Sequence, residues 1–164
     1  MTFVAGQILR ASQLRAIIPT KVPILSDQSV TNSATLVDAT NITISGALGT
    51  TVEVALDLMY QGTVAGDFKC AWAWTTGTFP WGFLGVDTGL AVSDISFDVT
   101  VTSGTTFNLG ANGANNTMLT RIRGIWTVGA STGTLKFQFA QAVAGGATSA
   151  TIKTGTLLTS IVIT

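Results

Sequence analysis

The stretch Thr51-Val-Glu-Val-Ala-Leu-Asp-Leu-Met-Tyr60 places a large apolar residue at every second position. Glu53 and Asp57 stand on the opposite side of the same stretch. Successive side chains of a β-strand point to opposite faces of the sheet, so a period of two indicates a strand with one buried and one wet face. The sequence therefore predicts a half-buried strand here.

The same period recurs along most of the chain, in residues 42–44, 68–74, 97–101, 118–128, 135–139 and 151–164. Clusters of Gly, Ser, Thr and Asn separate these segments, and such clusters are typical of turns. We end the buried part of the segment that begins at Leu135 at Phe139, because Gln141 is polar. About eight to ten short strands at this spacing predict an all-β fold, an antiparallel jelly-roll sandwich.

The N-terminal segment differs from the rest, since residues 4–18 alone have helical character. Ser12 can cap a short helical turn that carries Leu14, Ile17 and Ile18, and Pro19 ends it. Residues 20–26 are expected to form an extended connector, because proline at position 23 disfavours helix before it.

Every charged residue before Asp27 is positive, namely Arg10, Arg15 and Lys21. A short, basic and partly apolar arm suits docking on another molecule. We therefore divide the chain into a docking arm, residues 1–26, and a jelly-roll domain, residues 27–164. The alternative is an arm that packs back on its own domain.

The composition excludes several classes of function. The 164 residues include no histidine, which is the usual acid, base and metal ligand near neutral pH, and one cysteine. Cys70 has no partner in the chain and is expected to be a small buried apolar residue. The formal net charge is zero, whereas binding to nucleic acid needs a basic excess. We expect no enzymatic activity, no cofactor or metal, and no nucleic-acid partner.

The surface is expected to be partly covered by other protein. Charged residues make up 10% of the chain, against about 25% in typical soluble domains, and the mean hydropathy is +0.50. No apolar run reaches the roughly 20 residues of a membrane-spanning helix, so a membrane partner is not expected. Outward positions such as Ala55, Met59, Ala71 and Ala73 are small or aliphatic. Burying them by closed symmetry favours a homotrimer.

A few residues are candidates for contacts. Arg121 and Arg123 share one strand face, where they could grip a carboxylate or phosphate, or form surface or inter-subunit ion pairs. Core packing is favoured for the clustered tryptophans, above all for Trp72 and Trp74, which continue the alternation of Phe68 and Cys70. Trp81 follows Pro80 in an expected turn and has more freedom to point outwards, where it could stack on a sugar. Glu53 and Asp57 lie roughly 13 Å apart along a strand, too far for a glycosidase pair. The Asn-rich loop 108–116 lacks the carboxylates of a calcium site.

The segment Phe3-Val-Ala-Gly-Gln-Ile-Leu-Arg-Ala-Ser-Gln-Leu-Arg-Ala-Ile-Ile-Pro19 resembles the opening of short virion proteins encoded by tailed phages of actinobacteria. The later segments 66–74, 133–141 and 147–157 look similar too, and the last two resemble the terminal strands of tumour-necrosis-factor-like jelly rolls, which are trimeric. The chain departs from the phage pattern at Arg15, where those proteins often carry Asn.

This resemblance implies a structural protein on the outer surface of a bacteriophage virion. We expect a homotrimer that decorates the capsid and is anchored by its N-terminal arm on the major capsid protein. The alternatives are a tail or fibre component that contacts the host cell surface through Trp81 and the Asn-rich loop, and a carbohydrate-binding module that recognises cell-wall glycan.

Overall fold

The computed structural model describes residues 18–85, 96–100, 102–113, 115–145 and 148–163. For residues 96–99 it describes the main chain alone. Four residues of the predicted arm that were candidates for contacts, Arg10, Leu14, Arg15 and Ile17, lie outside the described residues, as does nearly all of the predicted helical segment. No helix occurs in the described ranges.

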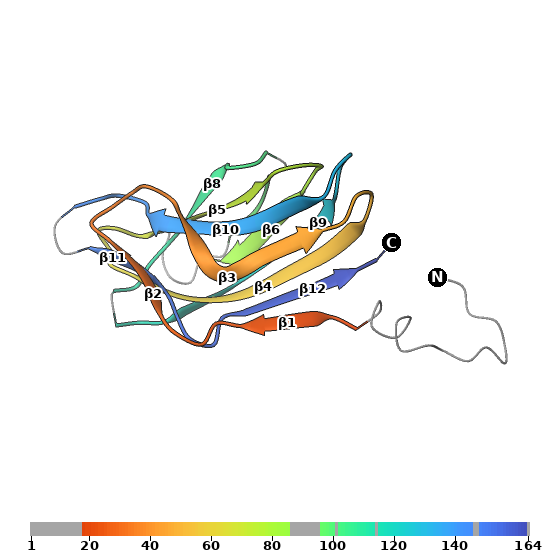
Figure 1. Cartoon of the computed structure of the whole chain (residues 1–164). Helices are drawn as coiled ribbons and strands as arrows, with labels where there is room; N and C mark the ends of the chain where they lie inside the picture. The colour runs from red at the N-terminus through yellow and green to blue at the C-terminus, as the bar shows by residue number, and fades with distance from the viewer. Residues whose placement is uncertain (1–17, 86–95, 101, 114, 146–147, 164) are drawn as a thin grey trace.

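Two antiparallel sheets pack face to face, as Figure 1 shows. The large sheet has the order β1-β12-β4-β9-β6-β7, with β11 pairing to β4 and β2 to β11, and the small sheet has the order β3-β10-β5-β8. The strands are β1 (Thr20–Pro23), β2 (Gln28–Thr31), β3 (Val37–Gly46), β4 (Thr51–Gly62), β5 (Phe68–Trp74), β6 (Trp81–Gly85), β7 (Ser96–Thr100), β8 (Thr106–Leu109), β9 (Met118–Thr127), β10 (Gly133–Gln141), β11 (Ser149–Ile152) and β12 (Leu157–Val162). The predicted all-β antiparallel sandwich is confirmed, and its strand order is compatible with a jelly roll.

The centre of the large sheet is the pairing of β4 with β9, which runs from Thr51 opposite Thr127 to Tyr60 opposite Met118. The even-numbered residues of β4 are buried, whereas Glu53 is exposed and Asp57 lies partly exposed on the outer side. The alternation predicted from the sequence is therefore confirmed, and it fixes which residues of β9 point outwards.

Aromatic rings fill the space between the sheets. The ring of Trp72 lies 5.1 Å from that of Phe137 and 5.6 Å from that of Phe79, measured between centroids, in edge-to-face geometry. The Tyr60 ring packs 4.9 Å from Phe68, and its hydroxyl donates a 2.8 Å hydrogen bond to the Gly110 carbonyl. Edge-to-face pairs of this kind add to the free energy of burial itself. Burial confirms the expectation for Cys70 and raises the pKa of its thiol to about 12.

One glycine of β9 is required by this packing. A Cβ atom on Gly124 would lie 2.4 Å from the Phe79 ring, closer than any tolerated contact. The missing side chain lets Phe79 settle against β9, opposite Trp72 and Trp74. Gly124 therefore allows β9 of the large sheet to approach Phe79 and the Trp72 ring of the small sheet. Its neighbour Arg123 points to the opposite, outer face of β9.

Side-chain amides close one corner of the sandwich, where β2 of the large sheet meets the small sheet. The Gln28 amide donates to the Thr40 carbonyl at 2.9 Å and accepts from the Thr40 amide at 2.6 Å, as a neighbouring strand would. Gln141 accepts from the Ser33 amide at 2.7 Å and is fully buried. The prediction that the buried part of this segment ends at Phe139 is therefore wrong. The hydrogen bond to Oε1 offsets part of the cost of burying Gln141, whereas its Nε2 atom has no partner among the described residues.

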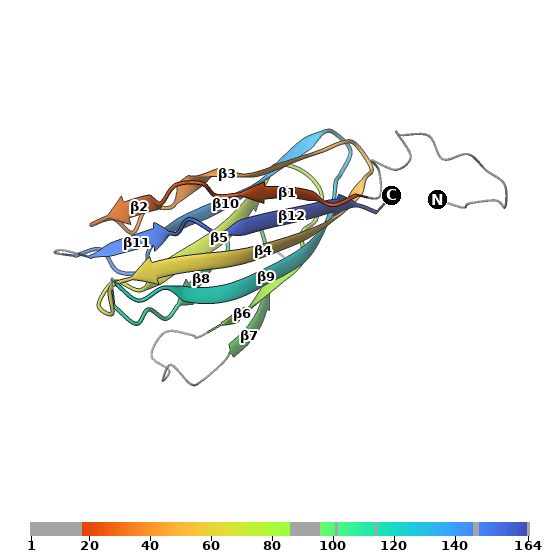
Figure 2. The same cartoon turned by 90° about the horizontal axis from the view of Figure 1, so that it is seen from below.

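The described part of the predicted arm belongs to the large sheet. Thr20 to Pro23 form β1, which pairs with β12, and Ile24 is buried. Residues 20–23 are extended, as expected, whereas Ser26 lies in a bend, and the sheet begins before the predicted boundary at residue 26. Figure 2 shows β1 beside β12 at the edge of the large sheet. In the part of the chain that the structure describes, no helix is long and apolar enough to cross a membrane.

Candidate interaction surface

Four neighbouring strands of the large sheet, β12, β4, β9 and β6, present one outer face that carries both predicted arginines. We call it the outer face of the large sheet, and Figure 2 shows these strands side by side. Two rows of directly opposed residues cross it, one with Leu157, Asp57, Arg121 and Leu84, the other with Thr159, Ala55, Arg123 and Gly82.

Both arginines are paired with carboxylates of β4. Arg121 donates from Nε to Asp57 Oδ1 at 2.5 Å, directly across the strand pair. Arg123 Nη1 lies 4.0 Å from Glu53 Oε1, along the diagonal. The hydrogen bond to Asp57 raises the pKa of Arg121. The predicted surface ion pairs are thus confirmed within one chain, and they leave the outer face with no net charge.

Aliphatic side chains surround these ion pairs. Leu119 is 70% exposed, Leu84 52% and Ile125 48%, and all three belong to β9 or β6. Ala55 and Met59 of β4 are partly exposed beside them. Single exposed aliphatic residues are ordinary, but here several lie together on one sheet face.

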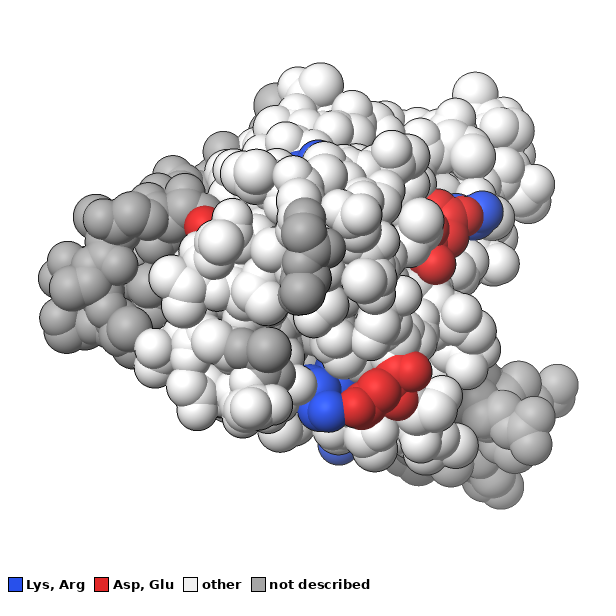
Figure 3. Space-filling model, turned by 90° about the vertical axis from the view of Figure 1, so that its left-hand side faces the viewer, with Lys and Arg blue, Asp and Glu red and all other residues white. Residues whose placement is uncertain are grey.

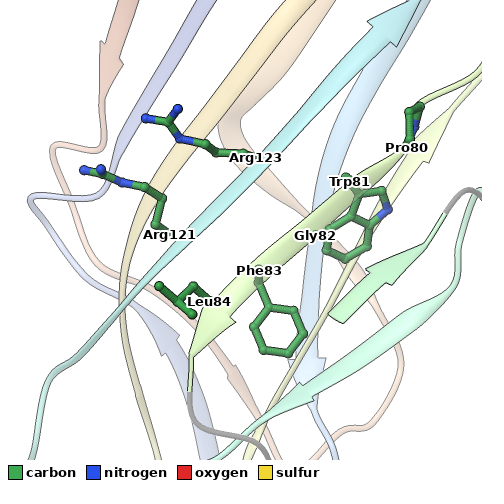
Figure 4. Close-up of a pocket in the computed structure, with 7 residues that line it drawn as sticks. All are labelled: Pro80, Trp81, Gly82, Phe83, Leu84, Arg121 and Arg123. Atoms are coloured by element: carbon green, nitrogen blue, oxygen red, sulfur yellow. The ribbon is translucent and has the colours of Figure 1, made fainter. Parts of the chain in front are cut away.

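A shallow groove lies on this face beside β6, with a cavity volume of about 370 Å³. Leu84, Pro80 and the two arginines border it (Figure 4). Gly82 faces outwards between Arg123 and β7 and has no side chain to fill the space. The groove is therefore an apolar depression with guanidinium groups along one side.

Trp81 does not point outwards. Its side chain is 1% exposed, and its ring lies 5.0 Å from the Phe107 ring inside the sandwich. In Figure 4 the rings of Trp81 and Phe83 extend away from the guanidinium groups. The residue belongs to a strand rather than to a Pro80 turn, so the hypothesis of an outward ring is wrong, and Trp81 packs in the core like Trp72. A sugar has no exposed indole to stack on at this position.

The remaining candidate lies elsewhere. Ile18 is 60% exposed and precedes β1, at the sheet edge rather than on the arginine rows. The structure thus brings Arg121, Arg123 and the main chain of Trp81 together, but not Ile18. The sequence analysis missed Leu119 and Ile125, although a signal was present. Both fall on the same side of the alternating strand as Arg121 and Arg123.

Two further ion pairs lie elsewhere in the described residues. Lys136 pairs with Asp38 at 2.6 Å, and Lys153 pairs with Asp27. Seen from the end of the sandwich, the surface is largely uncharged, with positive and negative groups mostly side by side (Figure 3). Within the described ranges no group of three or more potential metal ligands occurs.

Comparison with known proteins finds distant structural likeness alone. No model of a known protein family matches the sequence, and no curated protein matches it. The fold is similar to part of a chain in the structure of infectious bursal disease virus, Gx strain, at a TM-score of 0.23 and 12% identity. That match covers 88% of this chain and 38% of the viral chain.

Two further solved structures show the same level of likeness. The VP2 subviral particle of that virus matches at a TM-score of 0.23 and 12% identity over 88% of this chain. The Gt strain structure matches at 0.25 and 9%, over 89% of this chain and 42% of that chain. The chain spans about two fifths of the length of these viral chains, and TM-scores this low assign it to no family.

Proposed function

We propose that this chain is a structural protein of a bacteriophage virion, a homotrimer that decorates the outside of the capsid and has no enzymatic role. The observation that carries the proposal is the outer face of the large sheet, where exposed aliphatic residues surround two internally compensated ion pairs. The N-terminal resemblance to phage virion proteins supplies the virion context.

The outer face suits contact with other copies of the chain. Each residue of a sheet covers an area given by the strand spacing of about 4.8 Å and the rise of about 3.4 Å per residue. The four strands of the outer face therefore cover a flat area on the order of 500 Å². Side-chain relief increases the accessible area towards the roughly 800 Å² that each partner contributes to a standard interface. Three copies that turn this face towards a common axis would bury it by closed symmetry.

The charges of the outer face are compatible with such burial. A charge that becomes buried without a partner is strongly unfavourable, whereas a paired and hydrogen-bonded one is tolerated. Arg121 and Arg123 already have Asp57 and Glu53 beside them before any partner arrives. The aliphatic rim of Leu84, Leu119 and Ile125 then supplies the favourable free energy of association.

In this proposal the arm anchors the trimer on the particle. The pairing of β1 with β12 holds the start of the described chain at the edge of the large sheet. Residues before it would reach from that edge to the major capsid protein. A tail location is the alternative outcome of the test below. The buried ring of Trp81 removes the contact on which a carbohydrate-binding role relied.

Particles that lack this protein provide the test. Labelled wild-type chain is expected to bind to their heads in electron micrographs, and binding to tails alone would replace the decorating role with a tail role. Arg123→Glu sets two acidic groups side by side on the outer face and is expected to separate the trimer. Binding to particles should then be lost, because each molecule carries one arm in place of three.

The matched control is Lys136→Glu, which reverses a charge beside Asp38 on the small sheet and is expected to bind normally. Particles that stay bare with wild-type protein, or that bind both variants equally, would contradict the proposal.

A further inference from the structure

The loop between β8 and β9 contains Asn112-Gly113, the one Asn-Gly pair among the six asparagines of the sequence. An asparagine side chain can be attacked by the main-chain nitrogen of the next residue. Glycine in that next position offers the least hindrance, because it has no Cβ and the widest range of backbone angles.

We propose that Asn112 is a site of spontaneous deamidation, with water as the co-reactant. The Gly113 nitrogen bonds to the Asn112 side-chain carbonyl carbon, and the amide nitrogen leaves as ammonia with the Gly113 proton. Water then opens the cyclic imide at either carbonyl, which yields aspartate or isoaspartate. Each event replaces NH2 by OH, which adds about 1 Da and one negative charge.

The attacking nitrogen of the pair meets little hindrance. Asn112 is exposed, and a Cβ built on Gly113 would meet a single neighbour within 4 Å, the Asn116 Nδ2 atom at 3.6 Å. The two main-chain carbonyls of the pair accept hydrogen bonds from Asn116, that of Asn112 from the Nδ2 atom and that of Gly113 from the main-chain amide at 3.1 Å, and neither bond involves the Gly113 nitrogen. Gly113 has a φ of 91°, a backbone conformation that a larger residue rarely adopts. Ring closure between these two residues therefore meets little steric resistance.

The residues just before the pair are anchored to the body of the protein. The Gly110 carbonyl accepts from the Tyr60 hydroxyl at 2.8 Å, and the Ala111 amide donates to Asp67 Oδ1 at 3.1 Å. The reaction at Asn112 leaves both hydrogen bonds in place. We therefore expect the modified chain to stay folded, with a loop that carries one more negative charge on a chain of net charge zero.

Asn32-Ser33 is the natural internal comparison, because serine is also a small following residue. There the attacking nitrogen is held, since the Ser33 amide donates to Gln141 Oε1 at 2.7 Å and Gln141 is fully buried. The Asn32 amide in turn donates to the Thr148 carbonyl at 3.2 Å. We expect Asn32 to stay intact while the chain is folded.

The variant Ser33→Gly distinguishes the effect of the Asn-Gly sequence on the deamidation rate from the effect of the fold. It creates a second Asn-Gly pair, and the main-chain amide of residue 33 still donates to Gln141. Folded variant protein is incubated in mildly alkaline buffer, and its peptides are mapped by mass. Conversion at Asn112 is expected to be about tenfold faster than at Asn32. The main-chain amide of residue 33 must first break its hydrogen bond, and the free energy of a single well-formed hydrogen bond corresponds to a factor of about ten in rate. In urea-unfolded chain the two rates should converge.

Asn112→Gln serves as the control, and the main modified peptide should disappear from its map. Equal rates at both sites in the folded variant would overturn the inference, and so would an Asn112 that stays intact in folded protein while the unfolded chain reacts.

Discussion

The outer faces of the two sheets differ in a way that their inner faces do not. On the small sheet the outward residues of β3 and β10 are polar, namely Thr43, Ser45, Thr134, Lys136 and Gln138, and Asp38 binds two of them. The neighbouring strand β5 adds Ala71, which is buried, and Ala73, which is partly exposed. On the large sheet the corresponding positions of β9 and β6 include Leu119, Ile125 and Leu84. Burial of one face dictates the alternation of a strand, but it leaves the chemistry of the other face free to differ between the two sheets.

The ion pairs of the two faces sharpen the contrast. Asp38 accepts from both Lys136 and Gln138 within a polar surface, a setting in which an exposed pair adds little to stability. The pairs of Arg121 and Arg123 stand among aliphatic residues instead. A partner that covers them would remove water and strengthen their interaction.

The largest effect is expected from Ile125→Asp, which places an unpaired carboxylate opposite Glu53 in the aliphatic rim of the proposed interface. Burying it should weaken association by several kcal/mol and leave the chain monomeric. Thr43→Asp makes the matched change on the small sheet and should leave assembly intact. Analytical ultracentrifugation of both variants, with circular dichroism to verify folding, checks this. Loss of assembly in both variants would remove the distinction between the two faces.

An intermediate effect is expected at the inner side of β9. Gly124→Val forces side-chain atoms into the Phe79 ring and should lower the free energy of unfolding by about 1–3 kcal/mol. Ile125→Val, one residue away on the outer side, should change it by less than about 0.5 kcal/mol in the isolated chain. Urea unfolding measures both values. Equal losses would show that the outer position is packed within the chain itself.

The smallest effect is expected from pH. Hydrogen bonds from Lys136 and then Gln138 lower the pKa of Asp38 below its ordinary value of 3.8, and those from Lys153 and Thr154 lower that of Asp27 to about 2. A carboxyl group with a lowered folded pKa stabilises the protein above its unfolded value, and that contribution disappears as the pH falls through the folded value.

Stability should therefore decline between about pH 4 and pH 2. Both groups are partly exposed, so each contributes at most about 1 kcal/mol. Urea midpoints across this range measure the decline, and Asp38→Asn should reduce its slope. A slope unchanged in that variant would show that the polar network of the small sheet adds nothing to folding.

Much of the fold could be predicted from the sequence. In strands such as residues 51–60, the alternation of apolar and polar residues predicts which side chains are buried. The same rule placed Arg121 and Arg123 on one face and Cys70 inside. The same alternation also places Leu119 and Ile125 on the face of the two arginines.

The rest depended on contacts between distant segments. Gln141 is buried because Ser33, more than a hundred residues away, donates to it. Trp81 points inwards because β6 pairs with β9 and sets its ring against Phe107, which no local pattern around Pro80 reveals. The four residues of β1 are too few to show a period, and their partner β12 lies at the far end of the chain.

Sedimentation equilibrium of the purified full chain tests the central claim most directly. The outer face of the large sheet is expected to hold three copies together, with a mass three times that of the 16.9 kDa chain. A mass of one chain at every concentration examined would contradict the account.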